Sequence, residues 1–435
     1  MKKALSVFLA VAMSASLLAG CGSKPAASTA STAASAAPEA KSVTLNVVTS
    51  YGGDDGNRKN YEAAYKAYES ATGNTVLDAS ETSNEEWKAK ISTDFETGSE
   101  PDVLFYFNGV DSNKIVENKK VVSIEEIRAE YPDYASNMKD EMLGASPVDG
   151  KNYSVPVNGY WEGLFVNKKV LADCGLEVPT AATTWDEFTE MCKTIAAKGY
   201  SPIACSLQEV PHYWFEYSVF NEGNLTNQTA VPASSTDEAG AKWVKGLNNI
   251  KTMYEAGFFP VNTLTAGDAD TFQLMADDKA AFAIDGSWKL GWFKDNAADV
   301  SNFTVTYVPG KGERKSTDLV GGLSMGYYIT RKAWDDPAKR EAAVQFVEAM
   351  TTDEVVSSFG ATAVTALKNG TAAPADADVL INDALALTKG ATGIAAAAED
   401  GLNSEARAAL FADVKNIATG KTTAEAAIDA CLAVK

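Results

Sequence analysis

Histidine is almost absent from this chain, since His212 is the only one among 435 residues. A zinc site built from several imidazoles is therefore excluded, and a Ser-His-Asp triad would have to use that one residue. Five cysteines are present, but Cys174, Cys192, Cys205 and Cys431 show neither Cys-X-X-Cys spacing nor a dense framework. These four are either buried thiols or include one disulfide, and the sequence leaves both open.

Positive charge is also scarce. The chain has 38 Lys and Arg against 58 Asp and Glu, for a formal net charge of −20. Because no basic excess is available to displace the counterions of phosphate groups, nucleic acid is not an expected partner. A hydrophobic fraction of 46% and a charged fraction of 22% are ordinary for globular proteins. At roughly 150 residues per domain, the length predicts two or three domains.

Long apolar segments are missing as well, and the longest one, residues 4–19, is too short and too rich in small residues to span a bilayer. It follows Lys2-Lys3 and ends in Leu18-Ala19-Gly20-Cys21, which resembles the lipobox of bacterial lipoproteins. The resemblance implies a signal peptide over 1–20 and a lipid on Cys21. It places the protein on the outer face of the cytoplasmic membrane, held there through the lipid anchor only. An ordinary signal peptide followed by a coincidental cysteine is the alternative.

The next segment has no large apolar side chain. Residues 23–41 are mostly Ala, Ser and Thr with two Pro, and such a composition cannot bury enough surface to fold. We therefore predict a disordered tether over residues 21–42.

From Val43 onwards the pattern alternates between strands and helices. It predicts strands over 43–48, 74–79 and 103–107, with helices between them that end at Gly73 and Gly98. This order indicates a parallel sheet, in which ligands bind beyond the carboxyl ends of the strands. The loops after Val48 and after Phe107 are therefore the first candidate sites.

A second set of elements begins near Pro156. A strand is predicted over 160–166, a helix from the capping box Thr184–Glu187, and a helix over 239–256. Later segments predict a helix and a strand over 272–284, a strand over 325–330 and a helix over 338–351.

Several of these segments, in one consistent order, resemble the extracellular solute-binding proteins of ABC importers, of the sugar-binding kind typified by maltose-binding protein. The segment Pro156–Leu171 is the most specific of them, although it departs from the family pattern at Val166, where Tyr is usual. The segments that carry the resemblance are 98–103 (GSEPDV), 149–156 (DGKNYSVP), 156–171, 179–188 (with TWDEF), 281–288 (AFAIDGSW), 321–328 (GGLSMGYY) and 339–351.

The resemblance implies an α/β, two-lobed class II periplasmic-binding-protein fold, in which each lobe is a mostly parallel sheet flanked by helices and a hinge joins the lobes. It places lobe one at 43–154 plus 319–365 and lobe two at 155–318 plus 366–435. It also implies a monomer that captures a carbohydrate and passes it to a membrane permease. Because no Gly-X-X-X-X-Gly-Lys-Ser/Thr motif is present, the ATPase of that importer would be a separate chain. No cofactor, metal or catalytic residue is expected.

Sugar hydroxyls need carboxylate and amide partners, and the apolar faces of sugar rings need aromatic platforms. Tyr160 and Trp161 are adjacent, so on a strand only one of them can face a cleft. His212 and Trp214 would share a face if their segment were a strand. The positions that match the family's ligand-contacting segments are Gly53, Asp54, Phe107, Asn108, Tyr160, Trp161, Glu162, Gln208, Glu209, His212, Trp214, Asp285, Trp288, Gly322 and Ser324. Glu399, in the C-terminal part, is a further candidate.

Two other functions stay open at this stage. The same transport role could serve a non-sugar solute, and a polyamine would suit the acidic candidates. A lipid-anchored glycoside hydrolase could use two of the carboxylates as acid and base, although no segment resembles a hydrolase motif.

Overall fold

The computed structural model describes residues 42–53, 55–145, 148–157, 159–360, 362–371, 375 and 377–434. The predicted signal peptide, Cys21 and nearly all of the predicted tether lie outside these ranges, as does Asp54. No helix within them is long and apolar enough to cross a membrane.

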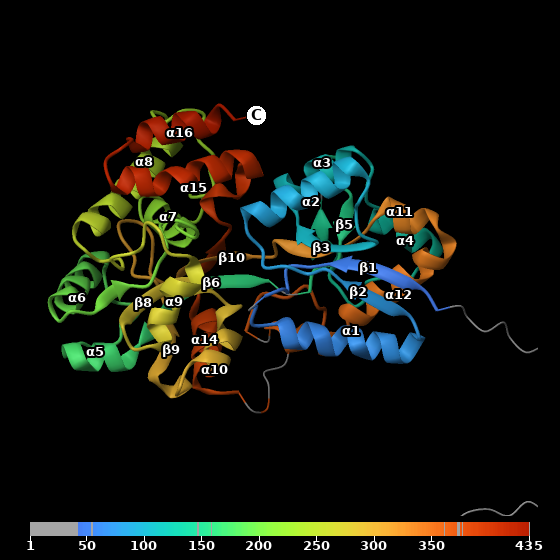
Figure 1. Cartoon of the computed structure of the whole chain (residues 1–435), viewed down its shortest axis with the longest axis horizontal. Helices are drawn as coiled ribbons and strands as arrows, with labels where there is room; N and C mark the ends of the chain where they lie inside the picture. Colours follow the sequence, from blue (N-terminus) through green and yellow to red (C-terminus); the bar gives the residue numbers. More distant parts are fainter. Residues whose placement is uncertain are drawn as a thin grey trace, which may run out of the picture. The chain divides into compact units, whose positions relative to one another are not determined.

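The first lobe is built on a sheet whose strand order is β11-β3-β1-β2 (Figure 1). Strand β1 pairs in parallel with β2 and β3, whereas β11 runs antiparallel to β3. The strands are β1 (Thr44–Val48), β2 (Thr75–Asp78), β3 (Val103–Phe107) and β11 (Met325–Ile329). The small pair β4 (Gly144–Ala145) and β5 (Asn152–Ser154) lies apart from this order.

Helices cover both faces of this sheet, because the apolar side chains of β3 alternate between them. Val103 and Phe105 pack in one hydrophobic cluster with α1 and α12, and Leu104 and Tyr106 pack in another with α2 and α3. The helices of this lobe are α1 (Arg58–Thr72), α2 (Glu85–Thr97), η1 (Gly109–Ser112), α3 (Asn113–Glu117), α4 (Ile124–Glu130), η2 (Asp140–Met142), α11 (Arg331–Asp335), α12 (Pro337–Met350) and α13 (Asp353–Gly360).

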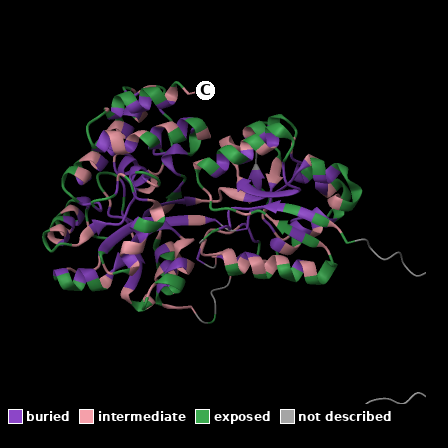
Figure 2. Cartoon of the chain, in the orientation of Figure 1, coloured by how far each residue is buried: buried purple, intermediate pink, exposed green. Residues whose placement is uncertain are grey.

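The second lobe is built on a six-stranded sheet of order β12-β10-β6-β8-β7, in which β9 also pairs with β6. The expectation of mostly parallel strands fails here, since β6 runs antiparallel to β8, β9 and β10 and only β10–β12 and β7–β8 are parallel. Figure 2 shows the strands of both sheets as largely buried. The strands are β6 (Tyr160–Asn167), β7 (Ser201–Ile203), β8 (Ala280–Gly286), β9 (Phe303–Thr306), β10 (Asp318–Gly322) and β12 (Gly393–Ala395).

Two hydrophobic clusters, one on each face of this sheet, hold the helices of the second lobe. Leu164 and Val166 pack with α5 to α8, α15 and α16, and Trp161 and Phe165 pack with α9, α10 and α14. The helices are α5 (Lys168–Cys174), α6 (Trp185–Ala197), α7 (His212–Phe220), α8 (Glu238–Glu255), α9 (Asp268–Ala276), α10 (Lys289–Asn296), η3 (Val300–Asn302), α14 (Val379–Gly390), η4 (Ala398–Gly401), α15 (Ser404–Ala418) and α16 (Ala424–Leu432).

The local signals that ended the predicted helices act as expected. Gly73 and Gly98 take left-handed conformations after α1 and α2, with φ of 73° and 77°. Asn84 caps α2 by accepting a hydrogen bond from the backbone N–H of Trp87. The capping box at Thr184 and Glu187 is formed at the start of α6.

The pairings differ from the predicted lobe limits at two places. Strand β10, which was assigned to lobe one from residue 319, pairs with β6 in the second sheet. Ala366 and Leu367, which were assigned to lobe two, pack in the hydrophobic cluster of the first lobe. Strand pairing and packing therefore favour a return crossing between Gly322 and Met325.

The structure also chooses between the two alternatives for the cysteines. Cys174, Cys192, Cys205 and Cys431 are buried, free thiols in the main hydrophobic cluster of the second lobe. They act there as small apolar side chains.

Candidate functional site

An aromatic group surrounds Trp288, which lies in the Ser287-Trp288 turn between β8 and α10. The ring of Trp288 lies 6.0 Å from the ring of Tyr160 on β6 and 6.0 Å from the ring of Tyr213 on α7. All three side chains are partly buried. Trp288 and Tyr160 were predicted, and Tyr213 is added by the structure.

The alternation of side chains along β6 decides which of its predicted residues belong here. Tyr160 and Glu162 share the face that carries Leu164, towards α7, and Tyr217 on α7 donates to the backbone oxygen of Glu162 at 2.7 Å. Trp161 points to the other face, is 0% exposed and packs against Phe165. The structure therefore places Trp161 in the hydrophobic core and not in the candidate site.

Three buried carboxyl groups from three elements meet beside the aromatic group. They are Glu162 on β6, Glu216 on α7 and Glu399 on η4, which are 2%, 1% and 3% exposed. Glu216 lies between the other two and interacts through hydrogen bonds with both. The Oε2 atom of each has no hydrogen-bond partner within the described structure. Glu162 and Glu399 were predicted and Glu216 was not.

Burial changes the proton affinity of these groups. It raises the pKa of Glu162, Glu216 and Glu399 well above the usual range of a carboxyl group, and repulsion between neighbouring carboxylates adds to the effect. The cluster therefore resists carrying three negative charges at once.

Asp285 and Lys289 form a second charged group next to Trp288. The Nζ atom of Lys289 lies 3.6 Å from Asp285 and 3.3 Å from Asp268. Burial raises the pKa of Asp285 to about 7, and the positive charge of Lys289 opposes this shift. The predicted residue Asp285 thus lies next to the aromatic group and shares the positive charge of Lys289 with Asp268.

His212 and Trp214 do not share a face, because their segment is the helix α7 and not the strand that this interpretation required. Residues two apart point in nearly opposite directions on a helix. Trp214 is buried against Phe188 in the core, while His212 packs against Phe411. Burial lowers the pKa of His212 to about 3, with further lowering by the charges of Lys88 and Arg407, so this histidine is neutral.

The first lobe contributes the residues that follow β3. The backbone N–H of Asn108 donates to the oxygen of Ser324 at 2.7 Å, so the two predicted segments lie together. The side-chain Oδ1 of Asn108 is already engaged, since it accepts from Ser154 and Tyr328. Phe107 is partly buried and has the Nζ atom of Lys88 4.2 Å from its ring.

Gly322 lies beside the aromatic group, because it pairs with Tyr160 where β10 meets β6. This predicted residue and Ser324 belong to the crossing between the sheets.

Ion pairs join this part of the first lobe to α15. Arg407 lies 2.5 Å from Asp111 and 3.3 Å from Glu85, and Lys88 lies 3.6 Å from Asp111. The charges of Arg407 and Lys88 also act on Asp400, the neighbour of Glu399. The two lobes therefore meet at the candidate carboxyl groups.

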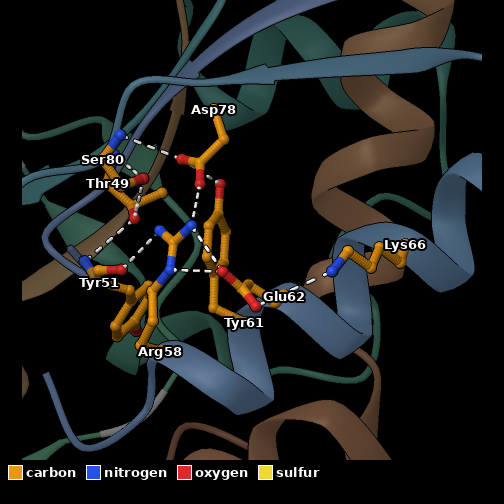
Figure 3. Close-up of polar contacts among 8 residues, drawn as sticks. All are labelled: Thr49, Tyr51, Arg58, Tyr61, Glu62, Lys66, Asp78 and Ser80. Carbon is orange, nitrogen blue, oxygen red and sulfur yellow. Dashed lines mark hydrogen bonds and ion pairs between the residues drawn. The ribbon is translucent and has the colours of Figure 1, made fainter. Parts of the chain in front are cut away.

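The loop between β1 and α1 reaches the site from the other side, and Arg58 holds it in place (Figure 3). Its guanidinium donates to the backbone oxygen of Tyr51 at 3.0 Å, to Asp78 at 2.6 Å and to Glu62 at 2.9 Å. Farther along this loop, a Cβ atom added to Gly56 would lie 2.2 Å from the backbone oxygen of Trp288. The predicted residue Gly53 lies in the same loop, is exposed and has φ of 58°.

Gln208 and Glu209 form hydrogen bonds with residues outside the aromatic group. Glu209 accepts from the backbone N–H of Asp268 at 2.7 Å and so caps α9. Gln208 accepts from Lys415 at 2.6 Å. Both are exposed, and neither contacts the aromatic group through any interaction seen among the described residues.

Two of the added residues had a signal in the sequence. Glu216 is the single acid in the otherwise uncharged segment Tyr213–Phe220. A carboxylate needs solvation or a polar partner, so its position in an apolar segment indicates a special role. Arg407 falls on the apolar stripe of α15 with Leu410 and Val414, both buried. Tyr213 had none, because α7 is apolar on nearly all sides.

Two sheets with helices on their faces, joined by crossing segments, and a shared site of aromatic and carboxyl groups define a two-lobed solute-binding protein. A sequence model of the bacterial extracellular solute-binding proteins matches residues 53–357. This range is more than half of the chain, and the chain belongs to that family, which consists of solute-binding proteins and not of enzymes.

Curated relatives are similar over part of the chain. The multiple sugar-binding protein of Streptococcus mutans is 25% identical over 233 residues, which are 52% of this chain and 53% of that protein. The melibiose/raffinose/stachyose-binding protein MelE of Bacillus subtilis is 25% identical over 244 residues, which are 51% and 54%. The chain thus spans about half the length of the curated relatives it matches.

Solved structures share the fold over nearly all of the chain. A chitin oligosaccharide binding protein has a TM-score of 0.78 at 21% identity and covers 90% of this chain and 98% of its own. A maltose-bound T. maritima protein, MalE3, has a TM-score of 0.69 at 17% identity, with 90% and 98% covered. At these identities the likeness establishes the fold.

Proposed function

We propose that this protein captures a carbohydrate between its lobes and delivers it to the permease of an ABC importer. The observation that carries the proposal is a group of three aromatic rings, Trp288, Tyr160 and Tyr213, of which the two tyrosines lie within electrostatic range of the buried carboxyls of Glu162 and Glu216. The similarity to a multiple sugar-binding protein and to a melibiose/raffinose/stachyose-binding protein supports it.

The chemistry of the two groups fits a sugar. Aromatic faces stack against the C–H faces of a sugar ring, while carboxyl oxygens accept hydrogen bonds from its hydroxyls. A buried acceptor without a partner is costly, so a ligand that supplies donors is stabilised at this site. Lobe one would add Phe107 and Asn108, and the crossing would add Gly322 and Ser324.

Hinge closure is the proposed mechanism. A ligand that contacts both lobes increases the population of the closed state by its differential affinity for that state. The Arg407–Asp111 pair and the approach of Gly56 to Trp288 join the two lobes, and both would be lost if the lobes moved apart.

The proposal extends to the location and the partners. The lipobox-like segment supports export with a signal peptide over 1–20 and a lipid on Cys21, which would hold the protein at the outer face of the cytoplasmic membrane. The protein would act as a monomer and would meet permease subunits whose ATPase is a separate chain.

A thermal-shift screen of the purified protein against neutral mono- and oligosaccharides tests the function. A ligand at 100 times its Kd stabilises the folded state by about 2.7 kcal/mol, which raises Tm visibly. The Trp288→Ala variant should weaken the binding of any sugar found by about tenfold or more, because it removes the central ring of the platform. The unliganded Tm of the variant controls for folding. If no saccharide changes Tm, the proposal is wrong.

A further inference from the structure

The three buried glutamates have more acceptor atoms than the protein satisfies. Their Oε2 atoms are buried and have no hydrogen-bond partner within the described part of the chain. An unpaired buried carboxyl oxygen costs more than an unpaired neutral group. A group that donates hydrogen bonds to several carboxyls at once would remove this cost.

The cations near the cluster are engaged elsewhere. Arg407 and Lys88 lie within ion-pair distance of Glu85 and Asp111. Lys289 lies within that distance of Asp268 and Asp285. Among the described residues, no Lys or Arg nitrogen is seen within 4.0 Å of the carboxyls of Glu162, Glu216 and Glu399. The cluster therefore has no cation in direct contact among the described residues, and only the longer-range charge of Arg407 acts on Glu399.

The aromatic group lies near this cluster of carboxyl groups. Both Tyr160 and Tyr213 interact electrostatically with Glu162 and Glu216. A cation beside carboxylates and over aromatic faces gains from ion pairing and from cation–π attraction. A neutral sugar gains only hydrogen bonds and stacking from the same groups.

We propose that the site selects a saccharide that carries a protonated amine, whose N–H groups donate to Glu162, Glu216 and Glu399 while the ring packs against Trp288. This inference rests on the proposed function and names the class of sugar.

Because these carboxyl groups are buried, the binding of an ammonium group should change the number of protons that they hold. Burial raises the pKa of all three carboxyls, which favours their protonated forms in the unliganded protein. An ammonium group stabilises their ionised forms, and binding then releases protons to the solvent. A neutral sugar leaves the protons in place. The groups that also face the cluster are Asp285, Asp400, Arg407 and the hydroxyls of Tyr160, Tyr213 and Tyr217.

Titration calorimetry with matched pairs tests the inference. The pairs are glucose and glucosamine, galactose and galactosamine, mannose and mannosamine, and the N-acetylated and deacetylated glucosamine dimers. At pH 7.5 we expect the amine of at least one pair to bind tenfold or more tightly than its neutral partner. Buffers of different ionisation enthalpy should show proton release with the amine only, and its affinity should fall at pH 5.5.

Two variants and one control connect the preference to these residues. Glu216→Gln, and separately Glu399→Gln, should reduce the preference for the amine at least tenfold, and either one is sufficient if the other fails to fold. Glu190→Gln places the same change on the exposed side of α6 and should leave the preference unchanged.

The remaining outcomes separate the two proposals. Equal or tighter binding of every neutral partner overturns the inference and leaves the proposed function intact. Calcium binding that is lost in Glu216→Gln, without any amine preference, also overturns it. Binding of spermidine with no saccharide bound overturns the proposed function, and no binding at all overturns both.

Discussion

The Nη2 atom of Arg407 donates to Oδ1 of Asp111 at 2.5 Å, although 296 positions separate the two residues in the chain. Arg407 belongs to α15 of the second lobe, and Asp111 belongs to η1, which follows β3 of the first lobe. Their side chains are 4% and 5% exposed. A buried ion pair therefore joins the two lobes beside the candidate site.

Removing one partner of this ion pair should lower the free energy of unfolding more than removing both partners. Asp111→Asn leaves the Arg407 charge buried with less compensation, and we expect a loss of about 3 kcal/mol in the free energy of unfolding. Adding Arg407→Met should recover most of that loss. Urea unfolding of the two single variants, the double variant and the wild type measures the coupling. Lys193→Ala, which breaks the exposed pair with Glu190, should cost less than about 1 kcal/mol. Strictly additive effects of the two buried substitutions would contradict the prediction.

A methyl group at Gly56 should interfere with closure. The added Cβ would lie 2.2 Å from the backbone oxygen of Trp288, and neither backbone can move away cheaply. We expect Gly56→Ala to raise the Kd of the captured ligand at least tenfold, with little change in the unliganded Tm. Small-angle scattering with saturating ligand should show a larger radius of gyration than in the wild type.

The Lys66→Ala variant on α1 is the matched control for Gly56→Ala. Lys66 forms an exposed 3.9 Å ion pair with Glu62 of its own helix, so its loss should change the Kd little. An unchanged Kd in Gly56→Ala would show that Gly56 and Trp288 do not approach when ligand is bound.

Asp285 should make the protein less stable as the pH rises. Its pKa is raised to about 7 in the folded state, against an ordinary value of 3.8, so between these values the folded state binds more protons than the unfolded state. Its contribution is therefore favourable at low pH and is lost as the pH rises towards 7. In the wild type, this effect should lower the free energy of unfolding by up to about 4 kcal/mol between pH 4 and pH 8, and Asp285→Asn should abolish that decline.

The measurement for Asp285 is urea unfolding at both pH values. The difference between Asp285→Asn and the wild type should be larger at pH 8 than at pH 4. Asp186→Asn, an exposed acid on α6, provides the same substitution without burial. A difference that is equal at both pH values would show that Asp285 has the same proton affinity in the folded and unfolded states.

Arg58 should not be replaceable by lysine. Its planar guanidinium bonds Tyr51, Asp78 and Glu62 at once, and a lysine cannot reproduce that fork (Figure 3). We expect Arg58→Lys to lower the free energy of unfolding by about 1 to 2 kcal/mol. Lys66→Arg, at the weaker 3.9 Å pair with Glu62, should be nearly neutral in the same urea experiment. If Arg58→Lys left the free energy of unfolding unchanged, the loop would be held by other contacts.

The sequence predicted the elements of the first lobe well because their signals are local. The run Val103–Phe107 is apolar on both faces, and the glycines that end α1 and α2 act within a single turn. The direction of the strands in the second sheet has no such signal. β6 has the same buried pattern whether its neighbours run parallel or antiparallel.

The candidate site was predicted less completely, for two physical reasons. The helix α7 is apolar around nearly its whole circumference, so its sequence carries no 3.6-residue period, and the strand interpretation of His212 and Trp214 failed there. The pairing of Arg407 with Asp111 depends on how segments far apart in the chain are brought together. Glu162, Tyr160 and Trp288 could be named because the family resemblance marked their positions.

The antiparallel addition of β11 to β3 has a consequence for the folding of the chain. Tyr328 donates to the backbone oxygen of Phe107 across 221 positions, so β3 has no partner on that side until most of the polypeptide is available. Contacts so distant in sequence slow folding. Until β11 arrives, Val103–Phe107 is an apolar strand with an open edge, which is the kind of segment that other chains can pair with. The newly made protein is therefore most prone to aggregation before its last third has been added.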